Sequence, residues 1–388
     1  MSLHMDGQVT LDDLYQAYLD CRRRKRNKKG AKRFEPHALT SLAEIRDEIN
    51  ERRYIPKPSQ CFIVKYPVPR EVFCAAFRDR IVQHFIYNEL NPVLEKMLIR
   101  DTCSCRLGKG TVCAVRRLAT FVRRETDNYT HDAWCLSFDL SGFFMNINRH
   151  VLLADMLDVI ENWYSGPYKD VLKYLVRIVI LTDVTKDAVR LCPKKDWELL
   201  SPGKTLFGNP NGLPIGNITS QLFANFYLNR LDHYMKSRHE SYVRYVDDGK
   251  VVDTDREKLE KTLEVSKVIL EALGQRFNDR KTVITKTGYG VLFLGVKVFP
   301  YYNALGDKRI GRLYHGSAMF NEAEAAYRSA SSRRGMFVRY RGWNLSHRWY
   351  DSFPEEIKEN LKMDSDATFH LIGHKKEKGK MQTIRLYV

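Results

Sequence analysis

The stretch "YVRYVDDGKVVD" at residues 242–253 places two adjacent aspartates between two runs rich in apolar and β-branched residues. Each run has the composition of a β-strand, so the pattern predicts a hairpin with Asp247 and Asp248 at its tip. Neighbouring carboxylates repel each other unless they lie solvated in a turn or share a bound cation. Other parts of the chain are needed to choose between a solvated turn and a cation site.

A third aspartate closes another predicted strand. "WCLSFD" (134–139) has strand composition and ends at Asp139. If this strand lies beside the hairpin, three carboxylates can hold a pair of divalent cations, which suits phosphoryl transfer. The pattern therefore predicts Asp139 and Asp247 as direct metal ligands and Asp248 as the third carboxylate. The intervening pattern predicts helices over about 149–181, a Gly-, Pro- and Asn-rich loop at 199–217 and an amphipathic helix at 219–238.

The charge balance favours a polyanionic partner. The 388 residues include 64 Lys and Arg against 47 Asp and Glu, a net charge of +17, which indicates nucleic acid before an anionic membrane. The run at 22–33 alone holds nine basic residues and is interpreted as a phosphate-contacting arm or, alternatively, a solvated charge run.

No apolar run is long enough to span a bilayer, so we expect no membrane association. Eight scattered cysteines are typical of reduced thiols and predict a cytoplasmic protein.

Seven segments stand in the order found in reverse transcriptases, and "YVDD" (245–248) resembles the active-site box of that family. The other six resemble the fingers helix, the element after it, the first metal box, the helix beneath the nucleotide, a lysine-bearing box and the primer grip. In that order they are "FRDRIVQHFIYNELNP" (77–92), "CRLGKGTVCAVRRL" (105–118), "LSFDLSGFFMNIN" (136–148), "GLPIGNITSQLFANFYLN" (212–229), "FNDRKT" (277–282) and "FLG" (293–295).

The resemblance implies an α+β chain with the right-hand polymerase fold. Its fingers would be followed by a palm of antiparallel sheet plus helices and by a small helical thumb. The reverse transcriptase domain would cover about residues 50–300. The expected divisions are a basic N-terminal helical arm at 6–50, fingers at 51–133, a palm at 134–300 and a thumb or basic C-terminal region at 301–388.

The resemblance also implies an RNA-directed DNA polymerase, a nucleotidyltransferase that uses two Mg²⁺ ions, with Mn²⁺ as a substitute. The implied metal ligands are Asp139, the backbone carbonyl of Leu140, Asp247 and Asp248. Lys281 would act as a catalytic lysine that protonates the departing pyrophosphate, unless it is a solvated loop lysine. The implied nucleotide-binding residues are Lys65, Arg70, Ser141, Gly142, Phe143, Phe144, Ile215, Gly216 and Gln221.

Two of these nucleotide-site residues have plain alternatives. Phe144 matches the position of a steric gate against a 2′-hydroxyl, but it can equally pack in the core with Phe143. Arg70 matches a fingers arginine that grips the triphosphate, but it can also be an exposed charge on a hairpin. The residues expected to contact template or primer are Arg78, Arg80, Lys109, Tyr245, Phe293, Leu294 and Gly295.

The helix box narrows the subfamily. Most reverse transcriptases have Gln-Gly-x-x-x-Ser-Pro there, whereas this chain has Ile215 in place of the glutamine and Gln221 in place of the proline. This departure resembles the reverse transcriptases of diversity-generating retroelements, which copy a template RNA into error-containing cDNA for mutagenic retrohoming. The implied partners are template RNA, a cDNA primer–template duplex, dNTPs and a small basic accessory protein.

Two other interpretations remain open. One is a different bacterial reverse transcriptase, such as an antiphage-defence enzyme. The other is a catalytically inactive RNA-binding scaffold, which should have lost a metal carboxylate, although Asp139, Asp247 and Asp248 are all present.

Overall fold

The computed structural model describes residues 7–66, 68–317, 320 and 322–372. The chain divides into two compact units, Met1–Lys286 and Thr287–Val388, which are taken separately below. The first residue of the expected N-terminal arm and the last sixteen of the expected C-terminal region lie outside the described residues. Within the described ranges, no helix is both long enough and apolar enough to cross a membrane.

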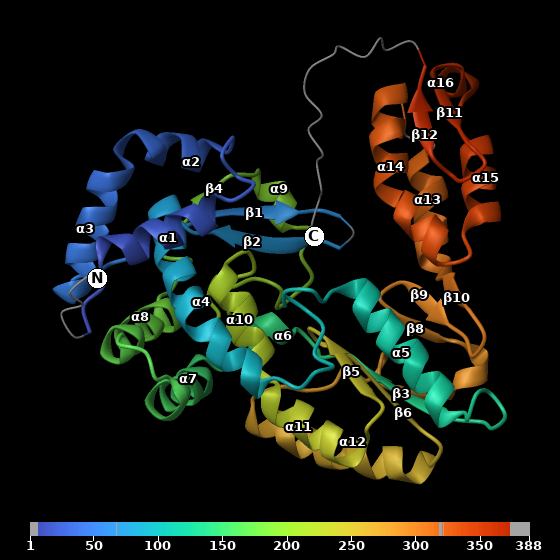
Figure 1. Cartoon of the computed structure of the whole chain (residues 1–388), viewed down its shortest axis with the longest axis horizontal. Helices are drawn as coiled ribbons and strands as arrows, with labels where there is room; N and C mark the ends of the chain where they lie inside the picture. Colours follow the sequence, from blue (N-terminus) through green and yellow to red (C-terminus); the bar gives the residue numbers. More distant parts are fainter. Residues whose placement is uncertain (1–6, 67, 318–319, 321, 373–388) are drawn as a thin grey trace. The chain divides into compact units, whose positions relative to one another are not determined.

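A four-stranded antiparallel sheet, in the order β5-β6-β3-β7, forms the centre of the first unit (Figure 1). The predicted hairpin is β5 (Tyr242–Tyr245) and β6 (Asp248–Asp253), and the predicted 134–139 strand is β3 (Trp134–Phe138). β6 pairs with β3 from Trp134↔Asp253 to Phe138↔Gly249, and β7 (Val283–Lys286) covers the other edge of β3. The strand that precedes Asp139 and the strand that begins at Asp248 are therefore direct neighbours.

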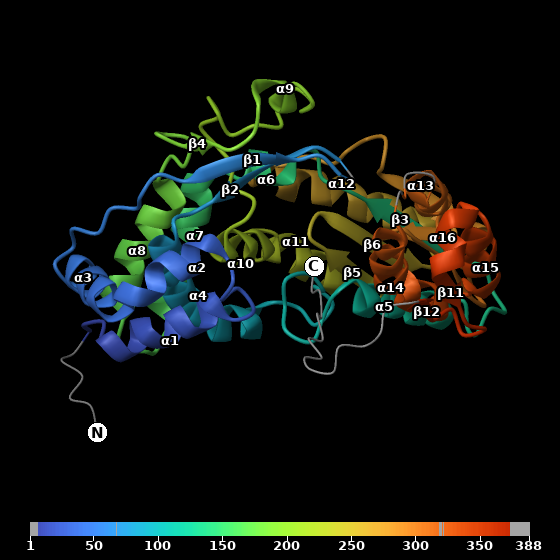
Figure 2. The same cartoon turned by 90° about the horizontal axis from the view of Figure 1, so that it is seen from above.

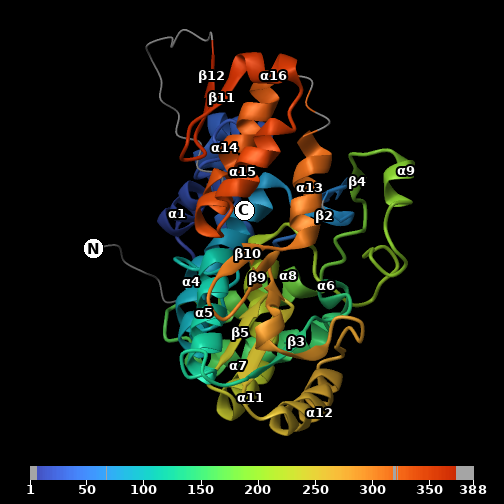
Figure 3. The same ribbon diagram turned by 90° about the vertical axis from the view of Figure 1, so that its right-hand side faces the viewer.

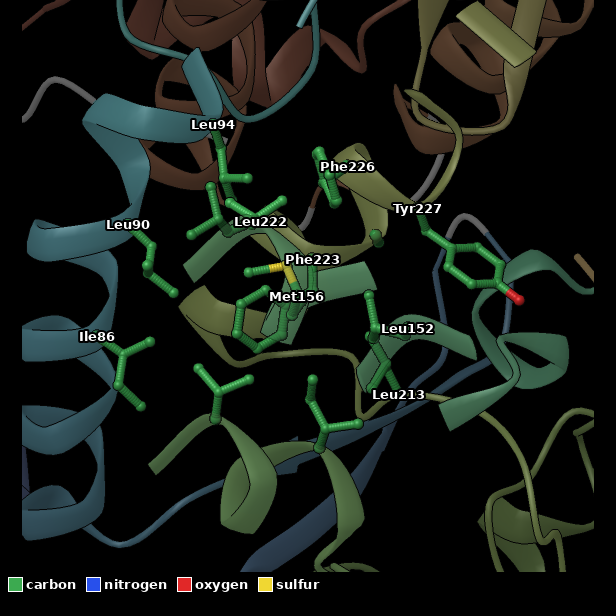
Figure 4. Packing of buried hydrophobic residues seen from close by; sticks show 14 of the residues in the cluster. Ile86, Leu90, Leu94, Leu152, Met156, Leu213, Leu222, Phe223, Phe226 and Tyr227 are labelled. Carbon is green, nitrogen blue, oxygen red and sulfur yellow. The ribbon is translucent and has the colours of Figure 1, made fainter. Parts of the chain in front are cut away.

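Helices bury the apolar faces of this sheet and of one another. α11 (Asn229–Arg238) packs on β5, and both α5 (Thr111–Glu125) and α12 (Arg256–Ala272) pack on β6. α4 (Phe77–Met97) packs against α10 (Ile218–Tyr227), and Figure 4 shows Leu90 and Leu94 facing Leu222 and Phe223. The predicted helix at 219–238 is two helices, because the chain leaves helical geometry at Leu228. α7 (Arg149–Trp163) and α8 (Lys169–Leu181) fill the predicted helical segment.

A smaller sheet, in the order β2-β1-β4, lies in the fingers segment. β1 (Gln60–Val64) and β2 (Arg70–Cys74) form an antiparallel hairpin in this sheet. β4 (Val189–Arg190) adds to β1 in parallel, and the short helix α9 (Lys194–Trp197) follows it (Figure 2). The loop between α8 and α10 is thereby attached to the fingers sheet.

The N-terminal helices are α1 (Leu11–Arg22), α2 (Lys29–Phe34) and α3 (Ala38–Asn50), with a short 3-10 turn, Glu35–His37, before α3. α1 begins at a capping box in which Thr10 and Asp13 bond each other's backbone N–H groups. The basic run at 22–33 forms the exposed connection between α1 and α2 and most of α2.

The second unit has its own core. It contains a sheet of β8 (Val291–Phe293), β9 (Val296–Val298) and β10 (Asn303–Leu305), which follows the 3-10 turn Thr287–Tyr289. Its helices are α13 (Asp307–Ser317), α14 (Ala323–Arg339), α15 (Trp343–Asp351) and α16 (Glu355–Asn360), gathered near the hairpin of β11 (Leu361–Met363) and β12 (Phe369–Leu371) (Figure 3). The fully buried Trp349 packs on Phe337, Phe353 and Phe369.

Candidate active site

Asp139 is held at the end of β3 by the segment 276–278. The N–H of Asn278 donates to the carbonyl of Asp139 at 2.8 Å, and the N–H of Ser141 donates to the carbonyl of Arg276 at 3.0 Å. Leu140 lies opposite Phe277 between these two bonds, so its own carbonyl is directed away from that segment. This orientation agrees with the predicted role of the Leu140 carbonyl as a ligand on the β6 side of β3.

The same segment brings Lys281 to the site. A turn closed by a bond from Lys281 N–H to the Asn278 carbonyl, 2.9 Å, follows the contact with Asp139. The ammonium of Lys281 then lies 2.9 Å from Asp139 Oδ2. The lysine side chain remains 62% exposed, so it can leave Asp139 and reach a ligand at small cost.

Of the two aspartates predicted at the hairpin tip, only Asp247 lies in the two-residue turn, because Asp248 is already the first residue of β6. Tyr245 pairs with Asp248, and Val246 and Asp247 form the tip. Val246 has φ +58°, which is a strained conformation for a β-branched residue. Two side chains hold it: Ser104 Oγ accepts the Val246 N–H at 3.0 Å, and Arg244 Nη1 donates to the Val246 carbonyl at 2.7 Å.

A buried polar network supports these two side chains. Arg244 and Asp232 form an ion pair with both side chains fully buried, and Asp232 also accepts bonds from Tyr242 and Thr102, each at 2.7 Å. Asn225 on α10 bonds both Arg244 and Ser104. The turn is thus tied to α10 and α11 through groups that have no access to water.

The carboxylates repel one another in the absence of a cation. Burial, then the nearby Asp139 and Asp248 charges, raise the pKa of Asp247 to about 6. Burial also raises the pKa of Asp248, although Lys250, whose ammonium lies 2.7 Å from Asp248 Oδ1, opposes the shift. The negative charge of Asp139 therefore disfavours ionisation of Asp247, whereas the Lys250 ammonium favours ionisation of Asp248.

The donor set fits a divalent metal at Asp139 and Asp247. Hard oxygen ligands with excess negative charge suit Mg²⁺, which binds through one or two carboxylates plus substrate phosphates. In the part of the chain that the structure describes, no three His, Cys, Asp or Glu side chains are arranged to bind a metal together. Two of the three carboxylates are paired with ammonium groups, Asp139 with Lys281 and Asp248 with Lys250.

Gly249 leaves room for a core ring directly after the aspartates. A Cβ on Gly249 would lie 2.1 Å from Cζ of Phe138, and Phe138 is fully buried. The Phe138 ring packs on Phe277 and Tyr242, with centroids 5.3 and 6.3 Å away. Because Phe138 precedes Asp139, the packing of this ring helps to fix the carboxylate.

The predicted nucleotide-binding segment Ser141–Phe144 follows Asp139 without interruption. Gly142 has φ +63° and begins the one-turn helix α6 (Phe143–Asn146). Phe143 is buried, whereas Phe144 is partly exposed with its ring 5.4 Å from that of Phe143. Phe144 thus has free surface for a gate in addition to its packing contact.

The helix-box residues dock on the fingers sheet. The carbonyl of Ile215 accepts the N–H of Phe73 at 2.8 Å, and the Ile215 side chain, partly buried, packs on the cluster of Cys61, Phe73, Met145 and Leu206. Gly216 has φ +124°, and a Cβ there would lie 2.4 Å from the Phe73 carbonyl. Gln221 is exposed in the first turn of α10.

The two predicted fingers cations differ. Arg70 begins β2 with an exposed side chain. Lys65 lies 2.8 Å from Asp196, a carboxylate that α9 supplies. Lys65 therefore faces the loop between α8 and α10 and has a partner there.

The predicted template and primer residues of the first unit lie on several different elements, and the others belong to the second unit. Arg78 pairs with Glu48, Arg80 donates to the Ala75 carbonyl, and Lys109 donates to the Arg100 carbonyl at 2.6 Å. Burial lowers the pKa of Lys109. Tyr245, beside the turn, is partly buried. In the second unit, Leu294 and Gly295, both with positive φ, form the two-residue turn that joins β8, which ends at Phe293, to β9.

Sequence patterns missed the supporting residues Ser104, Asn225, Asp232, Arg244 and Lys250. A charged residue within an apolar strand was the available signal for Arg244, because such a side chain needs a buried partner. For Lys250, the alternation of a strand places residues 248 and 250 on the same face.

Residues 55–298 match the family described as reverse transcriptase (RNA-dependent DNA polymerase). Protein YkfC of Escherichia coli K12 is 23% identical over 319 residues, which cover 71% of this chain and 76% of that protein. The solved structures with a similar fold include telomerases. Apo telomerase of Candida tropicalis, truncated from its C-terminal domain, has 13% identity and a TM-score of 0.45 over 69% of this chain and 60% of its own. Telomerase of Candida albicans with a fragment of telomeric RNA has 12% identity and a TM-score of 0.43 over 82% of this chain and 62% of its own. The chain thus spans about 60% of these telomerase chains.

Proposed function

The chain belongs to the reverse transcriptase (RNA-dependent DNA polymerase) family, and from this premise we propose that it extends DNA primers on an RNA template by two-metal phosphoryl transfer. Its α+β architecture is the right-hand polymerase fold that the sequence predicted. The observation that carries the proposal is the pairing of β3 with β6, which places Asp139, directly after β3, beside the hairpin turn that holds Asp247. Burial and then the Asp139 charge raise the pKa of Asp247.

Asp139 and Asp247 would hold the cations, with the Leu140 carbonyl as a further oxygen ligand. When bound, Mg²⁺, or Mn²⁺ in its place, would favour ionisation of the primer 3′-hydroxyl and neutralise charge on the pyrophosphate. Lys281 would exchange its contact with Asp139 for the leaving pyrophosphate and donate a proton there. Phe144 would exclude a 2′-hydroxyl, and Arg70 would bind phosphate oxygens with its planar guanidinium.

Primer extension tests this assignment. With an RNA template, a DNA primer and Mg²⁺, Asp247→Ala should reduce the rate at least about a hundredfold, because it removes several kcal/mol of transition-state stabilisation. Asp158→Ala is the matched control, since Asp158 is an exposed aspartate on α7. Equal extension by Asp247→Ala and the control would overturn the site.

We further propose that the polymerase is the error-prone type that diversifies a gene through cDNA. Ile215 supports this, because an apolar side chain cannot hydrogen-bond to a nucleotide or template base, and apolar contacts discriminate weakly between substrates. Template RNA and a small basic accessory protein are the proposed partners, with the exposed basic residues at 22–33 available for RNA phosphates.

Sequencing of cDNA made on a defined RNA tests the subtype. Ile215→Gln should lower the misincorporation frequency at template adenines. Ile215→Val is the control, because it keeps an apolar side chain against the cluster of Phe73 and Leu206. An unchanged error spectrum in Ile215→Gln would remove the fidelity argument, whereas accurate copying by the wild type would remove the subtype.

A further inference from the structure

The loop between α8 and α10 is fastened to the fingers by a buried carboxylate. Glu71 on β2 is 1% exposed and accepts three hydrogen bonds from this loop. The donors are Trp197 Nε1 at 3.1 Å, Thr205 Oγ1 at 2.8 Å and the Leu206 N–H at 2.8 Å. A buried charge needs such donors to remain ionised, so the loop and Glu71 fix each other.

Other contacts fasten the same loop to the segment after Asp139. Leu206, 1% exposed, packs with Met145 and Phe73. Asn209 Nδ2 donates to the Met145 carbonyl at 2.9 Å, and the N–H of Gly212 donates to the Ile147 carbonyl at 2.8 Å. The loop therefore connects β2, which carries Arg70, to the nucleotide-binding segment.

This anchored loop places a lysine beside Gly142. The ammonium of Lys204 lies 3.3 Å from the position that a Cβ on Gly142 would occupy. Lys204 directly precedes Thr205, one of the Glu71 donors, so its backbone is held although its side chain is exposed. No ion pair or hydrogen bond of its ammonium occurs within the described ranges, in contrast to Lys65, which Asp196 engages.

We propose that Lys204 is a binding residue for the triphosphate of the incoming nucleotide, delivered by the loop that Glu71 anchors. The inference rests on the proposed polymerase function and extends its nucleotide site by an element outside the seven segments. The Lys204 ammonium has no acidic partner in the described ranges and lies beside Gly142, which follows Asp139 by three residues. It is therefore placed to bind a polyphosphate whose other oxygens face the proposed metal site. The absence of a side chain at Gly142 leaves room for that approach.

Steady-state primer extension with varied dNTP concentration tests the role. Lys204→Ala should raise KM for the dNTP about tenfold, which corresponds to the lower end of the free energy lost with a hydrogen bond to a charged group. The same variant should change kcat less than twofold. Lys204→Arg should restore KM to within about threefold, since it keeps the charge. Lys195→Ala removes an exposed lysine of α9 in the same loop and should leave KM unchanged.

Equilibrium binding separates this inference from the polymerase function. Calorimetric titration of the full chain with inorganic tripolyphosphate in Mg²⁺ should show weaker binding for Lys204→Ala and unchanged binding for Lys195→Ala. If the wild type fails to extend any primer but this difference persists, the polymerase proposal fails and the anion site stands. Equal KM and equal tripolyphosphate affinity for Lys204→Ala and wild type would overturn the inference, as would equal losses in both alanine variants.

Discussion

Removing the carboxylate of Asp232 should strongly destabilise the first unit. Asp232 is fully buried and accepts bonds from Thr102, Tyr242 and two nitrogens of Arg244. In Asp232→Ala the guanidinium of Arg244, also fully buried, keeps its charge without a counterion. Breaking one side of such a pair costs about 3–5 kcal/mol, a large part of the roughly 5–15 kcal/mol that stabilises a typical domain.

Urea denaturation of the full chain measures this loss. We expect the unfolding midpoint of the first unit to fall by roughly 1 M, taking about 4 kcal/mol and a slope of about 3 kcal/mol/M. Asp158→Ala is the control and should change the unfolding free energy by no more than about 0.5 kcal/mol, because its carboxylate is exposed on α7.

A double variant, Asp232→Leu with Arg244→Met, separates the charge from the turn. It removes both buried charges, so it should be closer to wild type in stability than Asp232→Ala. It also removes the Arg244 donor to the Val246 carbonyl, so primer extension should remain impaired. A loss below about 1 kcal/mol in Asp232→Ala, or full extension by the double variant, would refute the reasoning.

Three further predictions concern the site. Ser104→Ala removes the acceptor of the Val246 N–H. Because it leaves one buried donor unsatisfied, it should lower kcat about tenfold. Ser104→Thr keeps the hydroxyl and should retain activity, and a fully active alanine variant would contradict this prediction. The pKa of Asp247, raised to about 6 from 3.8, means that the folded chain holds an extra proton between these pH values, so metal-free stability should fall as pH rises through that window. In EDTA at pH 7, Asp247→Asn should therefore raise the unfolding free energy by up to about 3 kcal/mol. If the unfolding free energies of the wild type and of Asp247→Asn depended on pH in the same way, this prediction would be wrong. Phe144→Ala should increase ribonucleotide use relative to deoxyribonucleotide use by at least about tenfold, measured by single-nucleotide insertion; unchanged selectivity would assign Phe144 to packing alone.

Local patterns were sufficient to predict the individual strands β3, β5 and β6 and the aspartates beside them. The apolar and β-branched composition of β5 and β6 and the short apolar run of β3 each specify a strand within a few residues. The segment at 77–92 that resembles the fingers helix is helical in α4, which continues through Pro92 to Met97 and packs against α10. Which strands pair followed from the family resemblance, since no local rule joins residues 139 and 247.

Contacts made by distant residues were not predictable in the same way. β4 has only two residues, both exposed, and its pairing with β1 depends on a loop that Glu71 holds. Asp232 lies in a helix and Arg244 in a strand, so no periodicity connects them. The pair Lys65–Asp196 likewise joins segments far apart in sequence, and the family resemblance, which implied a nucleotide as the partner of Lys65, gave no sign of it.

The Phe138 ring packs directly over Gly249. A change in the packing of the hydrophobic core at this ring would therefore also shift the site residue that follows it, Asp139. A methyl group at position 249 would displace that ring, and the displacement would reach the adjoining Asp139 before the sheet itself came apart. In a saturation mutagenesis screen, position 249 would therefore be as intolerant of substitution as the proposed metal-binding positions, although Gly249 contributes only the space that the Phe138 ring occupies. Intolerance at a residue beside paired aspartates is thus not by itself a sign that the residue touches substrate.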